Sequence, residues 1–135
     1  MKRDDLMYHA AVIDNDSGCL EYMSRLLEQN GHITLVTCFQ QWASYLEELK
    51  NGNIHIAFIR VDSPGLQGFS LAKVTQKVSP VTRIVFISSA ESYAVIAFEE
   101  RASGYLVLPV RQKRLDEVIE NIRKRDLWRR GGLSK

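Results

Sequence analysis

The sequence lacks the features that mark several large classes of protein. It has two cysteines and three histidines in 135 residues, and Cys19 and Cys38 are too far apart for the close CxxC pairs of zinc and redox sites. No apolar stretch approaches the roughly 18 residues that span a bilayer, and the start of the chain has no apolar core of signal-peptide length. We therefore expect a cytoplasmic protein without membrane contact, in which both cysteines are reduced and buried.

Length and charge limit the domain organisation. A chain of 135 residues, 45% hydrophobic and 25% charged, suits one compact domain and leaves no room for a second. The net charge of +2 is unevenly spread, because residues 111–135 hold nine Lys and Arg against four Asp and Glu. We expect a domain over residues 1–124 and a basic C-terminal tail or linker over residues 125–135. DNA contact through this basic segment is the alternative to a solvated helix end.

Short apolar runs alternate with stretches of helical period. Runs at residues 10–13, 34–38, 54–59, 83–88 and 105–108 predict strands, and helical spacing of apolar residues follows each of them. The runs are continuously apolar, which is typical of a parallel sheet covered by helices on both faces. The predicted fold is therefore α/β, a flavodoxin-like doubly wound (βα)5 domain with a five-stranded parallel sheet in the order 2-1-3-4-5. In that order the functional crevice lies beyond the carboxyl ends of the first and third strands.

Polar side chains follow the predicted strands at this crevice. Asp14 and Asp16 come directly after the first strand, where two carboxylates could hold Mg²⁺. For Asp16, capping of the next helix is an equally good interpretation. Ser88 or Ser89 ends the fourth strand, where a hydroxyl can donate to a phosphoryl oxygen or satisfy a group of the loop. Pro109 follows the fifth strand and predicts a tight turn, for which a cis peptide bond is one option.

Four motifs carry a resemblance to a known family. They are "AVIDND", "SPGLQGF", "ISSA" and "AFEERASGYLVLPV". The first resembles the acidic first-strand motif of response regulator receiver domains, the second their "MPGMDGF" loop, the third their "LTA" switch and the fourth their "AFEAGADDYLVKPF". Residues 8–124 thus resemble a receiver of bacterial two-component signalling, most similar to receivers placed before LytTR-type DNA-binding domains. No such output domain lies within these 135 residues.

The resemblance makes Arg60 unusual. In the family the phosphate-accepting aspartate lies four residues before the loop proline, and that place before Pro64 is taken by Arg60. The lysine expected just before Pro109 is replaced by Leu108. Phosphoryl transfer to a receiver needs a carboxylate nucleophile, a metal ion and a cation. The resemblance therefore implies a degenerate pseudo-receiver, a binding module that is not an enzyme and needs no cofactor.

Three hypotheses for this pocket remain open. In the first, Arg60 lies on Asp14 or Asp16 and takes the place of Mg²⁺. In the second, Arg60 only extends from the end of a buried strand, without a specific partner. In the third, Asp62 is a displaced phosphoacceptor used with Mg²⁺, although its position two residues farther on is expected to overshoot the pocket by about 6 Å.

The resemblance also implies a surface for partners. We expect a protein partner, or a second copy of the chain, to bind the face formed by the fourth helix, the fifth strand and the fifth helix, with Ser88 and Tyr105 coupling it to the pocket. Regulation of transcription is a downstream effect that fits, with DNA contact only through the basic tail or an output domain. A nucleotide-binding flavodoxin is disfavoured because "DNDSG" offers carboxylates, not the N–H groups of a phosphate loop. The three histidines are predicted at the opposite ends of the strands, away from the crevice.

Overall fold

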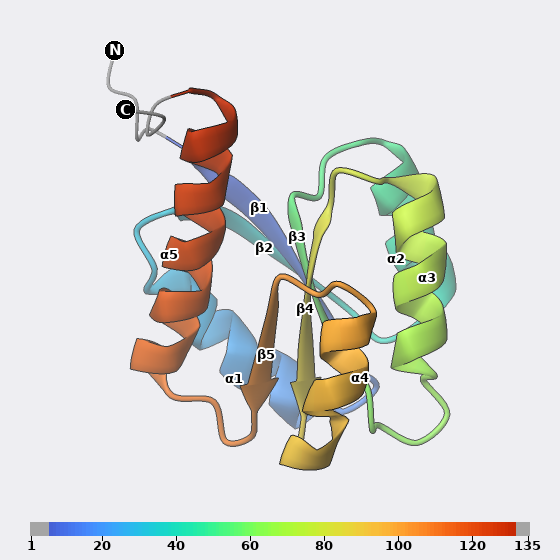
Figure 1. Ribbon diagram of the computed structural model, residues 1–135. Helices are drawn as coiled ribbons and strands as arrows, with labels where there is room; N and C mark the ends of the chain where they lie inside the picture. Colours follow the sequence, from blue (N-terminus) through green and yellow to red (C-terminus); the bar gives the residue numbers. More distant parts are fainter. Residues whose placement is uncertain (1–5, 132–135) are drawn as a thin grey trace.

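Strands and helices alternate along residues 6–131, which are the residues that the computed structural model describes (Figure 1). The strands are β1 (Tyr8–Ile13), β2 (Ile33–Phe39), β3 (Ile56–Arg60), β4 (Arg83–Ser88) and β5 (Gly104–Val107). The helices are α1 (Ser17–Glu28), α2 (Trp42–Lys50), α3 (Gly68–Val78), α4 (Ala94–Glu99) and α5 (Gln112–Arg129), with a 3-10 turn η1 (Glu91–Tyr93) before α4.

The strands form one parallel sheet in the order β2-β1-β3-β4-β5, which confirms the prediction. The chain first winds outward from β1 to β2 and then crosses to β3 and continues the other way. In the register of β1 and β3, Ile13 lies beside Ile59. The residues that follow these two strands therefore meet at one edge of the sheet, where the crevice of a doubly wound fold lies.

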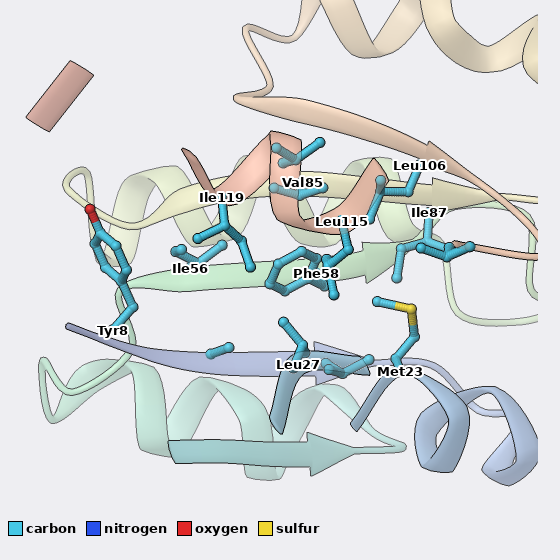
Figure 2. Packing of buried hydrophobic residues seen from close by; sticks show 14 of the residues in the cluster. Tyr8, Met23, Leu27, Ile56, Phe58, Val85, Ile87, Leu106, Leu115 and Ile119 are labelled. Carbon is cyan, nitrogen blue, oxygen red and sulfur yellow. The ribbon is translucent and has the colours of Figure 1, made fainter. Parts of the chain in front are cut away.

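Helices cover both faces of the sheet because its strands are apolar on both sides. Helices α1 and α5 pack on one face, where Phe58, Val85 and Leu115 belong to one buried cluster (Figure 2). Helices α2, α3 and α4 pack on the other face over a second cluster, which includes Ile59 and Phe86. Alternate residues of each strand belong to the two clusters, as the pleat requires.

The last helix is longer than the sequence pattern predicts. We expected a tail or linker from residue 125, but α5 continues to Arg129. Leu127 is buried, and Asp126 accepts a hydrogen bond of 2.9 Å from the Tyr8 hydroxyl and forms an ion pair with Arg83. These contacts hold residues 125–129 on the domain, while residues 132–135 lie outside the described part of the chain.

The cysteines are free, but their burial differs from the prediction. Cys38 is exposed, because β2 is an edge strand with one side toward solvent. Cys19 is half-buried, and burial together with a hydrogen bond to Asp14 raises the pKa of its thiol to about 12.

Within residues 6–131, no helix combines the length and the apolar character needed to cross a membrane.

Candidate functional site

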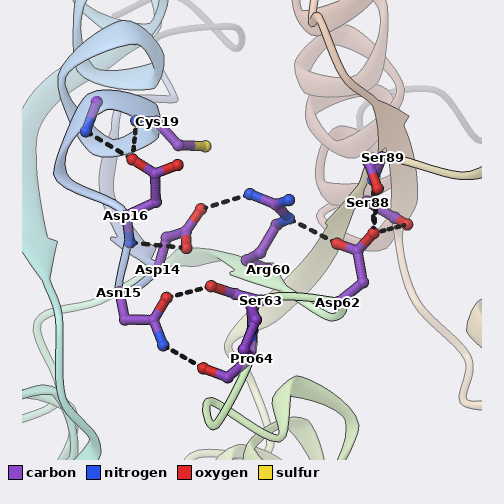
Figure 3. A network of polar contacts seen from close by, with 11 residues as sticks. Asp14, Asn15, Asp16, Cys19, Arg60, Asp62, Ser63, Pro64, Ser88 and Ser89 are labelled. Carbon is purple, nitrogen blue, oxygen red and sulfur yellow. Dashed lines mark hydrogen bonds and ion pairs between the residues drawn. The ribbon is translucent and has the colours of Figure 1, made fainter.

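The candidate site lies at the carboxyl ends of β1, β3 and β4 (Figure 3). Asp14 directly follows β1, Arg60 is the last residue of β3 and Ser88 is the last residue of β4. Because these three strands are neighbours in the parallel sheet, their last residues meet although they are far apart in the sequence. The structure thus brings together three of the residues that the sequence placed at the crevice.

The Arg60 guanidinium bridges two carboxylates. Its Nη1 lies 3.0 Å from Oδ2 of Asp14, and its Nε lies 2.6 Å from Oδ1 of Asp62. Asp14 is fully buried and only 13% of the Arg60 side chain is exposed, so both charges depend on each other for compensation. Burial by itself would lower the pKa of Arg60, but the hydrogen bond to Asp62 and the charge of Asp14 outweigh burial and raise it. The arginine therefore has specific partners and is not merely extended toward solvent.

The Asp62 carboxylate lies inside the pocket, which corrects the expectation that it would overshoot. Its Oδ2 accepts hydrogen bonds from the Ser88 hydroxyl at 3.2 Å, from the Ser89 N–H at 3.0 Å and from the Ser89 hydroxyl. The expected overshoot assumed an extended strand, but β3 ends at Arg60 and the chain bends through residues 61–63. Burial opposes ionisation of Asp62, yet the bonds from Ser89 and Arg60 hold the pKa of its carboxyl well below the usual range.

The side chain of Asp16 has a structural role, although its main chain contacts Asp14. Its side chain accepts hydrogen bonds from the N–H groups of Gly18, at 2.9 Å, and Cys19, at 3.3 Å, and so caps α1. The main-chain N–H of Asp16 donates to Oδ1 of Asp14 at 3.1 Å. The capping interpretation of Asp16 is therefore confirmed, and the two aspartates face different partners.

A second connection across the crevice was missed by the sequence analysis. Asn15 donates from Nδ2 to the carbonyl oxygen of Pro64 at 2.5 Å, and its Oδ1 accepts from the Ser63 hydroxyl. These bonds join the loop after β1 to the loop after β3. The available signal was an amide residue between two aspartates, since an asparagine side chain both donates and accepts.

The loop after β3 is also fixed at its far end. A side chain at Gly68 would overlap the carbonyl oxygen of Arg60, so the start of α3 lies directly against the end of β3. Inside the loop, Leu66 is buried and its carbonyl oxygen accepts a hydrogen bond of 2.7 Å from Nε1 of Trp42. Both ends and the middle of this loop are thus anchored to the body of the domain.

Leu108, the first residue after β5, supplies no charge to the pocket. The peptide bond between Leu108 and Pro109 is cis, which was one option for this turn. The Leu108 side chain packs against the apolar cluster under α1 and α5, and its N–H donates to the carbonyl oxygen of Ser88 at 2.8 Å. Leu108 therefore joins the core at the position where the resemblance expects a lysine.

Ser88 and Tyr105 are connected through Ala90, which lies directly before η1. The Ala90 N–H donates to the Ser88 hydroxyl oxygen at 3.0 Å, and the Tyr105 hydroxyl donates to the Ala90 carbonyl oxygen. Ser88 is fully buried, whereas Tyr105 is partly exposed beside α4 and α5. The loop thus links the pocket to the outer surface.

The histidines lie at the other end of the sheet, as predicted. His9 contacts the carbonyl oxygen of Asn53 and the Thr37 hydroxyl, and its main-chain N–H donates to Nδ1 of His55 at 2.8 Å. Nδ1 of His32 lies 3.2 Å from the carbonyl oxygen of Leu6. In the described part of the chain, no group of three or more His, Cys, Asp or Glu residues is arranged to hold a metal ion.

Comparison with known families agrees with the fold and with the motifs. The family model of the response regulator receiver domain matches residues 10–120. This chain belongs to the response regulator receiver family. The receiver is 25% identical over 116 residues to the sensory transduction protein LytT of Enterococcus faecalis, covering 86% of this chain and 48% of LytT. It is 27% identical over 114 residues to the transcriptional regulatory protein LytR of Staphylococcus aureus, covering 84% of this chain and 46% of LytR.

The receiver therefore spans about half the length of these curated relatives. Solved structures support its fold. A receiver domain protein from Clostridium thermocellum matches with a TM-score of 0.77 and 23% identity, over 89% of this chain and 97% of that one. A CheY-like receiver domain protein from Methanospirillum hungatei matches with a TM-score of 0.75 and 19% identity, over 88% of this chain and 95% of that one.

The residues of this receiver do not fit the Mg²⁺ ion that its family implies. A divalent cation there would need carboxylate oxygens that are free to bind it. Oδ2 of Asp14 and Oδ1 of Asp62 are both bound to the Arg60 guanidinium, and Asp16 faces the start of α1. A metal ion would have to displace the guanidinium, which carries a charge of the same sign.

Proposed function

We propose that this receiver is a pseudo-receiver, which signals by protein–protein contact without normal aspartyl phosphorylation. The observation that carries the proposal is the double ion pair of Arg60, which lies at the family's acceptor position and bridges Asp14 and Asp62. A guanidinium cannot form an acyl phosphate and keeps its charge at any physiological pH. The chain acts in this proposal as a binding module and not as an enzyme.

The apolar side chain of Leu108 supports the same proposal. Transfer of a phosphoryl group develops negative charge that must be neutralised by cations placed around it. Leu108 is packed against the core and offers no such cation. A lysine in its place would face the positive charge of Arg60, so the two departures from the family pattern are physically consistent.

The partner surface that we propose is the face formed by α4, β5 and α5. On α4, the side chains of Val95 and Phe98 are 67% and 84% exposed, and residues three apart on a helix are neighbours on its surface. Beside them, a hollow is lined by Tyr105, Arg111 and Arg114 among others. Apolar anchors beside arginines are typical of the centre of a protein interface. A protein partner, or a second copy of the chain, with apolar and acidic side chains would fit this face.

One observation favours a second candidate, an active phosphoreceiver that uses Asp62. Its carboxylate lies in the pocket beside the hydroxyls of Ser88 and Ser89. Against this candidate, each carboxylate oxygen of Asp62 is already bound, one by Arg60 and the other by three donors. The same hydrogen bonds, which lower the pKa of the carboxyl, also hold the lone pairs with which it would attack phosphorus.

Intact-mass analysis after incubation with Mg²⁺ and acetyl phosphate separates the two candidates. We expect no phosphoryl adduct on the wild-type chain. An adduct that disappears in Asp62→Asn would contradict the pseudo-receiver and assign the acceptor to Asp62. The Arg60→Asp/Leu108→Lys variant is the positive control, because it restores the acceptor and the cation together.

The same assay tests the role of Leu108. Arg60→Asp alone should accept phosphate poorly, since no cation neutralises the developing charge, and the double variant should accept more. Equal phosphorylation of the single and double variants would show that our account of Leu108 is wrong.

A further inference from the structure

The Asp62 carboxylate is the centre of a hydrogen-bonded chain that crosses the pocket. Its Oδ1 is held by Arg60 at 2.6 Å, and its Oδ2 accepts from Ser88 and Ser89. Figure 3 shows the carboxylate between the guanidinium on one side and the two serines on the other. We propose that Asp62 is a built-in anion, which fixes the loop between β4 and α4 in one position. The proposal rests on the proposed function, because it supposes that no phosphoryl group competes for the same donors.

Three donors from two consecutive residues bind Oδ2 of Asp62. They are the Ser88 hydroxyl, the Ser89 N–H and the Ser89 hydroxyl. A set of this kind suits an anion, because each N–H or O–H points its positive end at the same oxygen. The negative charge of Asp62 is secured by Arg60, whose guanidinium is itself fixed on the buried Asp14. The pocket thus contains its own anion and its own cation.

The chain of hydrogen bonds continues from the serines to the surface. The Ser88 hydroxyl oxygen accepts from the Ala90 N–H at 3.0 Å, and the Ala90 carbonyl oxygen accepts from the Tyr105 hydroxyl. Each bond involves a residue that also takes part in the next one. Loss of the Asp62 charge should therefore weaken the hydrogen bonds of Ala90 and Tyr105, although Asp62 contacts neither residue directly.

The position of this loop determines where α4 begins on the surface of the domain. Turn η1 and helix α4 follow directly after Ala90, and α4 carries the exposed Val95 and Phe98. An anion that is permanently in place holds the start of this segment without an incoming signal. In the proposal, the face of α4 and β5 is therefore held in the same arrangement without phosphorylation.

Amide hydrogen exchange measured residue by residue by NMR tests this proposal on the full chain. In Asp62→Ala, the Ser89 and Ala90 amides should exchange about tenfold faster than in the wild-type chain, because their shared anchor is removed. The Tyr105 ring resonances should shift in the same variant. Unchanged exchange rates at Ser89 and Ala90 would overturn the proposal.

Asp16→Asn is the matched control. It removes a carboxylate from the same end of the sheet, but Asp16 accepts only from main-chain groups of α1, and asparagine caps a helix equally well. Exchange at Ser89 and Ala90 should not change in this variant. An equal increase in Asp16→Asn and Asp62→Ala would show a general charge effect and overturn the assignment to Asp62.

Ser89→Ala provides a second variant if Asp62→Ala does not fold. It removes one donor and keeps the charged pair, so Ala90 should exchange faster while the Arg60 contacts persist; no change at Ala90 would contradict the proposal. These results do not depend on the phosphorylation assay. A phosphoryl adduct would overturn the proposed function, whereas the exchange rates of untreated protein decide on the built-in anion.

Discussion

The two ends of the sheet each hold an arginine–aspartate pair, but the pairs have different surroundings. At the amino end, Arg83 is paired with Asp126, and both side chains remain about one fifth exposed, at 20% and 19%. At the carboxyl end, Arg60 faces two acids, and one of them, Asp14, is completely buried. Water can still solvate the first pair, whereas the second pair depends on its own geometry.

The two arginines have different roles in the stability of the fold. Arg83 connects β4 to α5, and Asp126 keeps a hydrogen bond from Tyr8 even if the arginine is removed. Arg60 compensates two negative charges at a place where the family pattern has a carboxylate and a metal ion. The pair at the amino end attaches α5 to the sheet. The arginine at the carboxyl end compensates the charge of a buried carboxylate, which would destabilise the fold if it were unpaired.

The largest expected effect is the loss of stability on removing Arg60. Arg60→Met keeps most of the apolar stem but leaves Asp14 buried without a counter-charge, which should lower the free energy of unfolding by about 3–5 kcal/mol. Arg83→Met leaves a partly solvated aspartate that still faces Tyr8 and Arg129, and should cost about 1 kcal/mol or less. Urea denaturation of both variants at neutral pH measures the difference. Similar losses would mean that the two ends are energetically equivalent.

A double variant sharpens this comparison. Adding Asp14→Asn to Arg60→Met removes the uncompensated charge, so it should recover part of the lost stability. Further destabilisation in the double variant would place the cost of Arg60→Met in lost packing instead of lost charge compensation.

A smaller effect is expected from magnesium on Arg60→Asp. This substitution leaves three carboxylates without the guanidinium, which favours a divalent cation. At a Mg²⁺ concentration of about ten times the dissociation constant, the free energy of unfolding should rise by about 1.4 kcal/mol. Thermal unfolding with and without Mg²⁺ measures the rise. Arg83→Asp, the control at the amino end, should show none.

The smallest expected effect is a dependence on pH that differs between the two ends. Partial burial, followed by the charge of His9, lowers the pKa of His55, whose neutral ring accepts the His9 N–H. The unfolded chain then binds the proton more tightly, so the stability from neutral His55 is present above about pH 6.5 and is lost as the pH falls below it. The lowered pKa of Asp62 means that its contribution is present above about pH 4 and is lost only in stronger acid.

Urea unfolding at about pH 7.5 and about pH 5.5 tests this prediction. The wild-type chain should be slightly less stable at the lower pH, and the difference should shrink in His55→Gln, which cannot titrate. A difference of the same size in His55→Gln would assign the pH dependence to other groups.

Much of the fold could be predicted because it follows from local pattern. The continuously apolar strands, of which Ile56 and Ile59 are examples, require a parallel sheet with two covered faces. The C-terminal end of α5 could not be predicted from the spacing of apolar residues. Its last turns are held by the contacts of Asp126 and Leu127 with distant residues, and not by helical periodicity. The prediction that Cys38 is buried was wrong for a similar reason. The sequence of an edge strand resembles that of an inner strand, so its exposure could not be predicted.

The site was predictable wherever two strands fix the positions of their last residues. Asp14 and Arg60 meet because Ile13 and Ile59, one position earlier in each strand, are paired in the sheet. The position of Asp62 depends on a bend after the strand, and no strand geometry gives that bend. The bridge from Asn15 to Pro64 joins two loops, and sequence patterns do not specify how loops face one another.

The close approach of Gly68 to Arg60 bears on how such a receiver could evolve. Because α3 begins against the end of β3, residues 61–67 form a loop whose two ends lie close together. Loops closed in this way tolerate exchange of their inner residues while the flanking elements stay in place. Exchange of residues 60–67 then changes one side of the pocket within an unchanged fold, whereas the cation that phosphoryl transfer needs is set separately at residue 108. A segment covering residues 60–67 should be transferable between relatives as one unit, provided that Gly68 and the loop's partners Asn15 and Trp42 are kept.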